Sequence, residues 1–327
     1  MNKRIFVWTK SLFEMLTRRH LRIKVMQEIY ACTLTQNDNL TSAEKHLTQS
    51  SLGFYQLYLT LLSLLIEIQS CGQELHKKNK NQYIKASDKA LNPKFFNNLA
   101  LAHLAKNNTL QSQLEKHKLN YWSQHDEYVR LVWDQVSESN LYSDYLVSET
   151  NGFDEDKSFL VSLFTEVIAP FERLHEFIEE IKPTWIDDLP LVNTIVRNTL
   201  THIKDHSQSN LVLTQAYKDP DDANFATTLF RKVMLNDSKL SAELEGRTPN
   251  WEQDRIAVLD MIILKMAIAE LLYFPEIPSK VTINEYLEIA KEYATPKSSV
   301  FINGILDVLV KEYSKSNDLN KNLKGLS

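Results

Sequence analysis

Glycine is scarce in this chain, and no other feature of the sequence restricts the possible folds as strongly. Only six glycines and nine prolines occur among 327 residues. Sheet-rich and α/β proteins of this size need more glycine for their tight turns and phosphate-binding loops. A hydrophobic fraction of 43% is enough for a sizeable core, and the length allows one or two domains. We therefore expect an all-α protein.

Apolar residues recur at helical spacing along most of the chain. The first strong pattern covers residues 16–36, where Leu21, Val25 and Ile29 follow one another at four-residue steps. Most prolines fall at or near the ends of the proposed helices, as helix geometry requires. No segment has a convincing strand pattern. Further helices are expected at residues 41–70, 95–120, 121–147, 156–181, 187–206, 220–236, 252–273, 282–294 and 298–315.

Two stretches of the sequence resemble one another. Residues 159–203 align without a gap on residues 225–269. We interpret the match as an internal duplication that forms a stacked helical core; chance agreement between amphipathic helices is the alternative. The residues Phe159, Leu163, Phe164, Val167, Leu174, Glu179, Trp185, Asp188 and Val192 fall on Phe225, Leu229, Phe230, Val233, Leu240, Glu245, Trp251, Asp254 and Val258.

The basic residues are concentrated at the N-terminus, although the whole chain has a net charge of −5. Residues 1–24 contain seven lysines and arginines against one acidic residue, Glu14. A basic N-terminal segment on an otherwise acidic chain binds an anion locally, whereas the rest of the chain repels it. The basic residues are Lys3, Arg4, Lys10, Arg18, Arg19, Arg22 and Lys24.

The sequence contains none of the usual catalytic motifs. It has no G-x-G-x-x-G string, no phosphate-binding loop, no H-E-x-x-H and no C-x-x-C. His202 and His206 are the only histidines at helical metal-ligand spacing, and no third ligand is evident. We therefore expect no enzyme, no metal site and no cofactor.

The cysteine content and the hydropathy pattern indicate the compartment. Cys32 and Cys71 cannot make a disulfide framework, so a reducing compartment is the simpler interpretation. The most apolar stretch, residues 57–68, is interrupted by polar side chains and is too short to span a membrane. A buried helix explains it better. We expect a cytoplasmic protein without membrane association.

Two segments resemble the NusB family of transcription antitermination factors. The first is RRHLRIKVMQEIY at residues 18–30, an arginine-rich start that runs into a Q-x-x-Y ending. The second covers residues 225–310 and contains IPSKVTINE at 277–285 and FINGILD at 301–307. The order and spacing of these strings are specific. The resemblance implies a NusB-like helical bundle with an enlarged helical middle region.

The region between the two segments is similar to the insert of longer NusB proteins from some bacterial lineages. In those proteins the chain tends to open near M-L-x-R-R-H-L-R, so we expect Met15 to be the natural start. The domains are then expected as follows: the basic helix and first helices at residues 1–70, a helical insert with one repeat copy at 71–220, a NusB-like C-terminal domain at 221–315 and a polar tail at 316–327.

The resemblance implies that the first helix binds RNA. Arg18 and Arg22 lie on one side of this helix, and Tyr30 lies on the same face as Arg19. Apolar residues occupy the opposite side. A guanidinium donates two parallel hydrogen bonds to a phosphate, and an aromatic ring stacks on an unpaired base. We predict that Arg18, Arg19, Arg22 and Tyr30 bind RNA. An ordinary solvated charged face is the alternative.

The C-terminal segment supplies the other expected contacts. In the family the phenylalanine at the position of Phe301 is associated with RNA, although here Val300 replaces the lysine that often precedes it. The family's protein partner is NusE, a small-subunit ribosomal protein, and the resemblance places its interface near Glu270 and Tyr273. The alternatives are a core position for Phe301 and packing of Tyr273 under the following turn. Gly304 is expected to let a neighbouring element approach closely.

These observations predict an adaptor that binds boxA-like single-stranded RNA together with NusE. Through this assembly it acts indirectly on the RNA polymerase elongation complex and supports ribosomal RNA transcription. The alternative is a helical interaction or ribosome-assembly scaffold without direct RNA readout. RNA cytosine methyltransferases with a NusB-like domain are excluded, because neither cysteine follows a proline and no glycine-rich cofactor loop is present.

Overall fold

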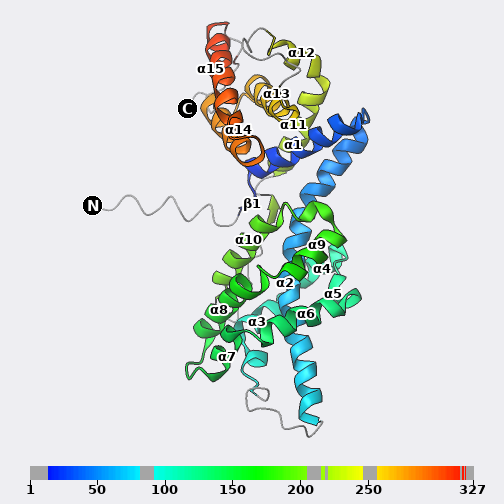
Figure 1. Cartoon of the computed structure of the whole chain (residues 1–327), viewed down its shortest axis with the longest axis vertical. Helices are drawn as coiled ribbons and strands as arrows, with labels where there is room; N and C mark the ends of the chain where they lie inside the picture. The colour runs from blue at the N-terminus through cyan, green and yellow to red at the C-terminus, as the bar shows by residue number, and fades with distance from the viewer. Residues whose placement is uncertain are drawn as a thin grey trace, which may run out of the picture. The chain divides into compact units, whose positions relative to one another are not determined.

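The computed structural model describes residues 14–81, 92–204, 215–217, 220–245, 256–316, 319 and 321 (Figure 1). The chain divides into two compact units, residues 52–216 with residues 1–15, and residues 16–51 with residues 217–327. We call the first the middle unit and the second the two-segment unit. Helices dominate both units, which confirms the all-α prediction. The strands within the described ranges are β1 (Glu14–Leu16) and β2 (Gln215–Tyr217), which pair with each other.

The two-segment unit is built around one apolar helix, α13 (Val258–Tyr273). Apolar residues occupy all faces of this helix, and such a helix is stable only when it is enclosed. It packs against the helices α1 (Arg18–Thr35), α11 (Pro220–Leu235), α12 (Asp237–Ala242), α14 (Ser279–Tyr293) and α15 (Ser298–Ser316). Helix α1 also packs on α11 and α14, so the first helix of the chain is joined to its last third.

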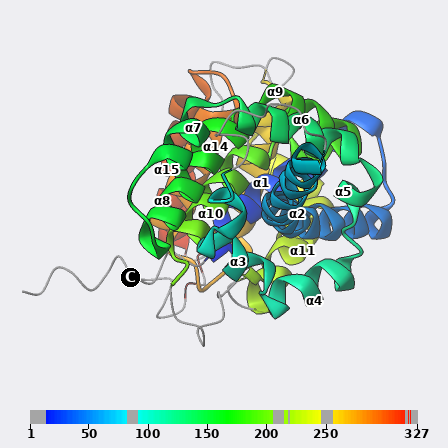
Figure 2. The same ribbon diagram turned by 90° about the horizontal axis from the view of Figure 1, so that it is seen from below.

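The middle unit contains the second part of α2 (Leu40–Asn81) and a series of short helices. These short helices are η2 (Phe95–Asn97), α3 (Leu99–Ala105), α4 (Asn108–His117), α5 (Tyr121–Gln124), α6 (Asp126–Ser137), α7 (Asn140–Val147), α8 (Phe153–Ser162), the π-helix η3 (Leu163–Ile168), α9 (Glu172–Ile181), η4 (Pro183–Trp185) and α10 (Leu189–Thr201). Helix α8 lies beside α10 (Figure 2) and also contacts α3 and α7, while α6 packs on α9 and η3.

Aromatic rings and one buried carboxylate stabilise the middle unit. The ring of Phe95 lies 5.7 Å from that of Trp133 and 5.5 Å from that of Tyr142, between centroids. The buried carboxylate of Asp156 accepts hydrogen bonds from the backbone N–H of Leu99 at 2.7 Å and from the Tyr145 hydroxyl at 2.6 Å. These bonds tie α3, α7 and α8 together.

Helix α2 is long and apolar enough to span a membrane, which the short, interrupted stretch at residues 57–68 does not indicate by itself. Its apolar residues extend beyond that stretch, and polar residues within it, such as Thr60 and Ser63, are buried. In the structure, 78% of its most apolar window is buried. The helix therefore has the burial of a core helix in a globular fold.

The internal repeat is only partly reflected in the structure and stays a prediction. Both stretches form helices, and the aligned residues Phe159 and Phe225 are both buried. Val192 is fully buried, however, whereas its counterpart Val258 is 44% exposed. Trp251 and Asp254 lie outside the described residues. The domain boundaries expected at residues 70 and 220 also stay a prediction; the structure divides the chain at residues 51 and 216.

Candidate functional site

The three arginines at the start of α1 each meet a carboxylate from a different helix of the two-segment unit. Thr17 opens the helix through a capping box, in which its backbone N–H donates to Nδ1 of His20 at 3.2 Å. The helix packs against α11, α13 and α14, and these helices supply the acidic partners. The pairs are Arg18 with Asp222, Arg19 with Glu285 and Arg22 with Glu270.

The pair of Arg22 and Glu270 is internal. Nε and Nη2 of Arg22 each donate to Glu270 at 2.7 Å, and the two side chains are 2% and 0% exposed. The hydroxyls of Thr282 and Tyr286 donate to the same carboxylate at 2.8 and 3.2 Å. Burial alone lowers the pKa of Arg22, but the attraction and hydrogen bonds of Glu270 outweigh it and leave this pKa raised.

This arrangement corrects two expectations. Arg22 was expected to present its guanidinium to RNA, and Glu270 was expected to contact a protein partner. Both side chains are enclosed because α1 is covered at this turn by α11, α13 and α14, and their polar atoms bind each other. Leu21, Ile23 and Lys24 are buried as well, so α1 does not have one fully exposed basic face.

Arg18 and Arg19 remain accessible. Their side chains are each 40% exposed. Arg19 donates through Nε and Nη2 to the two oxygens of Glu285, at 3.0 and 2.9 Å. Arg18 donates through Nε to Asp222 at 3.0 Å, and its guanidinium lies 5.3 Å from the centre of the Phe225 ring. The terminal nitrogens of Arg18 are not used in that bond, so they can bind a further acceptor.

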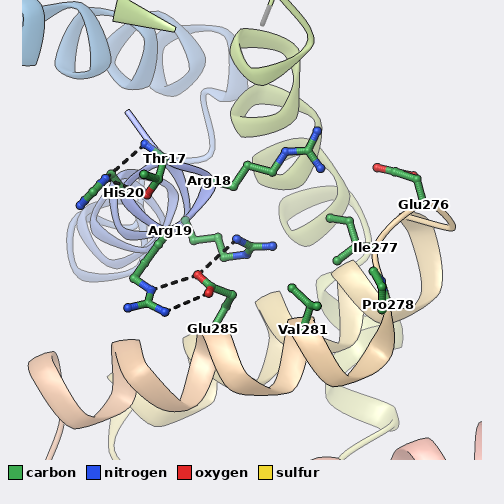
Figure 3. Close-up of a pocket in the computed structure, with 10 residues that line it drawn as sticks. Thr17, Arg18, Arg19, His20, Glu276, Ile277, Pro278, Val281 and Glu285 are labelled. Carbon is green, nitrogen blue, oxygen red and sulfur yellow. Dashed lines mark hydrogen bonds and ion pairs between the residues drawn. The ribbon is translucent and has the colours of Figure 1, made fainter. Parts of the chain in front are cut away.

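The two outer arginines line an open cavity of about 570 Å³ (Figure 3). Figure 3 shows the guanidinium of Arg19 facing the carboxylate of Glu285, whereas Arg18 points toward another side of the cavity. Apolar atoms of Ile277, Pro278 and Val281 complete one wall. The cavity therefore combines the guanidinium groups of Arg18 and Arg19 with an apolar wall, and the carboxylates of Glu276 and Glu285 also line it.

His20 contributes no positive charge at neutral pH. Burial and, to a lesser extent, the neighbouring charge of Arg19 lower the pKa of His20 to about 4. In the neutral ring Nδ1 accepts from the backbone N–H of Thr17, and the hydroxyl of Thr17 lies 2.9 Å from it. His20 is thus part of the helix start, and the accessible charge in this region comes from Arg18 and Arg19.

The predicted aromatic contacts lie on two helices. Tyr30 is 39% exposed on α1, and Phe301 is half-buried in the first turn of α15. Helix α14 packs against both α1 and α15, so it connects the helices that carry these residues. Val300, which precedes Phe301, is 76% exposed. The structure places these side chains within one unit, and their role in RNA binding stays a prediction.

Tyr273, predicted to lie at the partner interface, is surrounded by an asparagine and two lysines. Tyr273 is half-buried, and its hydroxyl donates to Oδ1 of Asn236 at 3.2 Å. The ammonium groups of Lys232 and Lys239 lie 4.8 and 5.7 Å from its ring centre. Glu270 is buried and is not accessible to a partner, and the role of Tyr273 in partner binding stays a prediction.

Some residues of the site were not identified as such from the sequence. Asp222 lies in the first turn of α11 and Glu285 in the middle of α14, and no local pattern marks either as a partner of an arginine. Lys3, Arg4 and Lys10, which belong to the basic N-terminal cluster, lie outside the described residues, as does His206. Within the described ranges, no group of three or more His, Cys, Asp or Glu side chains is arranged to hold a metal ion.

Comparison with known proteins defines the class. Residues 191–311, from α10 to α15, match the model of the NusB family. A transcription antitermination protein NusB from Salinibacter ruber is 40% identical over 109 residues, which are 33% of this chain and 68% of that protein. The chain belongs to the NusB family.

Two further relatives carry the same name. The NusB of Chloroherpeton thalassium is 40% identical over 103 residues, 32% of this chain and 49% of the relative. That of Natranaerobius thermophilus is 36% identical over 107 residues, 32% of this chain and 77% of the relative. No solved structure matches the chain. The similarity thus covers about a third of the chain, and this protein is much longer than the segment it shares with these relatives.

Proposed function

We propose that this protein acts in transcription antitermination by binding a boxA-like single-stranded RNA together with NusE. Membership of the NusB family supports the general role, because the relatives are named transcription antitermination proteins. In this proposal the assembly acts on elongating RNA polymerase in the cytoplasm and supports ribosomal RNA transcription. The chain makes and breaks no bond and needs no cofactor.

The observation that carries the proposal is the pair of accessible guanidinium groups at the open cavity. Arg18 and Arg19 are each 40% exposed there, and an arginine fork fits the oxygens of a phosphate. Tyr30 on the same helix and Phe301 on α15 offer rings for bases, at roughly 1–3 kcal/mol for each stacked base. Two outer arginines give modest affinity alone, which agrees with a need for a protein partner.

A titration of fluorescently labelled boxA-like RNA, followed by anisotropy with and without NusE, tests the proposal. The double variant R18A/R19A should bind at least tenfold more weakly than the wild type and show a flatter dependence on salt. The matched control is R130A/R173A, which removes the same charge from exposed positions in α6 and α9. Equal affinity of R18A/R19A and the wild type would instead favour a scaffold without RNA readout.

The NusE partnership rests on the family resemblance. We keep Tyr273 as the residue proposed to contact NusE. Glu270 is no longer proposed for this contact, because its side chain is buried. A Y273A variant that retains RNA binding but loses the additional affinity conferred by NusE would support the assignment. Unchanged cooperation between NusE and RNA in that variant would place the partner elsewhere on the protein.

A further inference from the structure

We infer that Glu285 is a built-in competitor for RNA phosphate at Arg19, so that this carboxylate sets the RNA affinity of the site. The inference rests on the proposed function and names a residue that regulates it. Glu285 occupies the two donors, Nε and Nη2, that an arginine offers side by side. A phosphate uses the same fork with the same bidentate geometry. RNA phosphate and Glu285 therefore cannot bind these two nitrogens of Arg19 at the same time.

The degree of exposure makes the exchange possible at this pair and not at the neighbouring one. Arg19 and Glu285 are 40% and 21% exposed, and both line the open cavity. An exposed ion pair of this kind contributes little free energy, so a phosphate can replace the carboxylate. Arg22 and Glu270 are almost completely enclosed, and separating them would leave a buried charge without a partner.

The structure also provides a partner for Glu285 after it leaves Arg19. Its Oε2 lies 3.7 Å from Nη1 of Arg22, the one terminal nitrogen that does not bond to Glu270. When Arg19 turns to a phosphate, the carboxylate therefore stays close to a second cation. The exchange thus does not leave Glu285 without a neighbouring cation.

The test compares two glutamates on α14 in the same RNA titration. E285Q removes the competing charge with almost no change of shape, and its affinity for boxA-like RNA should rise about fivefold. The control is E288Q. Glu288 lies about one helical turn after Glu285, its side chain is exposed, and it bonds to Lys291, so this variant removes the same charge from a neighbouring position. The affinity of E288Q should change less than twofold, because Glu288 bonds to Lys291 and acts on Arg19 only through a longer-range attraction that solvent screens.

A double-mutant cycle of E285Q and R19A tests whether Glu285 competes with RNA phosphate for Arg19. E285Q should improve binding when Arg19 is present and should have no effect in the R19A background. The more conservative E285D keeps the charge but shortens the reach to Arg19, and it should give an intermediate gain. Thermal unfolding of every variant, followed by circular dichroism, separates changes in binding from changes in folding.

The outcomes distinguish this inference from the function on which it rests. If the wild type binds RNA and E285Q binds equally or more weakly, Glu285 only positions Arg19 and the inference is overturned. An equal gain for E285Q and E288Q overturns it too, because general electrostatics would then explain both. If neither the wild type nor E285Q binds the RNA, with or without NusE, the proposed function fails as well.

Discussion

Arg22 and Glu270 form a closed ion pair in which two hydrogen bonds of 2.7 Å join side chains that are 2% and 0% exposed. The resemblance to the NusB family implied that one of these residues binds RNA and that the other contacts a protein partner. Their mutual contact indicates instead that the pair fixes α1 against α13, and that Arg18 and Arg19 remain available for a ligand.

Breaking this pair should be costly. The R22M variant leaves the carboxylate of Glu270 buried without its cation, so we expect it to lower the free energy of unfolding by about 3–5 kcal/mol. The double variant R22M/E270M removes both charges and should recover at least half of that loss. Denaturant unfolding followed by circular dichroism measures both effects. A single variant as stable as the wild type would show that the pair does not stabilise the unit.

Protonation of His20 should make the protein acid-sensitive. The pKa of His20 is about 4 in the folded protein, mainly because burial disfavours its charged form, against about 6.5 in the unfolded chain. The unfolded state therefore takes up the proton first as the pH falls. The stability contributed by this group is complete above about pH 6.5 and decreases by up to about 3 kcal/mol as the pH approaches 4.

The variant H20Q, which replaces the titrating ring by a neutral amide, isolates this effect. A glutamine oxygen at this position can still accept from the backbone N–H of Thr17, so the capping box is kept without a titrating group. Between pH 7 and pH 4 the wild type should lose more unfolding free energy than H20Q. Parallel stability curves for the two proteins would contradict the assignment of the acid sensitivity to His20.

Two glycines within helices should respond in opposite ways to alanine. A Cβ at Gly72 would lie 2.5 Å from two ring carbons of Trp133, and the neighbouring aromatic side chains restrict any movement of that ring. We expect G72A to destabilise the protein by about 1–3 kcal/mol. A Cβ at Gly304 meets no atom within 4 Å, which corrects the expectation of a close neighbour there.

G304A is therefore the matched control for G72A. It should stabilise the protein by about 0.5–1 kcal/mol, because alanine favours the helix and nothing opposes its side chain. The midpoints of thermal unfolding should shift in opposite directions for the two variants. A fall in the midpoint for both would mean that the space beside Gly304 is occupied.

Much of the fold could be predicted from the periodicity of apolar residues, but the breaks between short helices could not. The predicted helix at 16–36 corresponds to α1, whereas the one predicted at 95–120 is divided among η2, α3 and α4. Asn98 and Asn107 cause these breaks, because each side chain accepts a hydrogen bond from a backbone N–H three residues later. In a sequence, such an asparagine is not distinguishable from a polar position on a continuous helix.

The candidate site was predictable only on its basic side. Arginines clustered in one helical turn are visible in the sequence, but their acidic partners are not. Asp222, Glu270 and Glu285 are separated from them by 204, 248 and 266 residues. Which arginine is enclosed therefore depends on how α1 packs against three distant helices, and no local pattern contains that information.

The role of Phe301 can be tested independently of the arginines. F301L keeps most of the apolar volume, so the stability should change by less than about 1.5 kcal/mol. The loss of an aromatic ring for stacking should weaken RNA binding at least fivefold. V300A, beside it on the exposed surface of α15, is the control and should bind as the wild type does. Anisotropy and thermal unfolding of both variants separate the two roles, because a core residue would change only the stability.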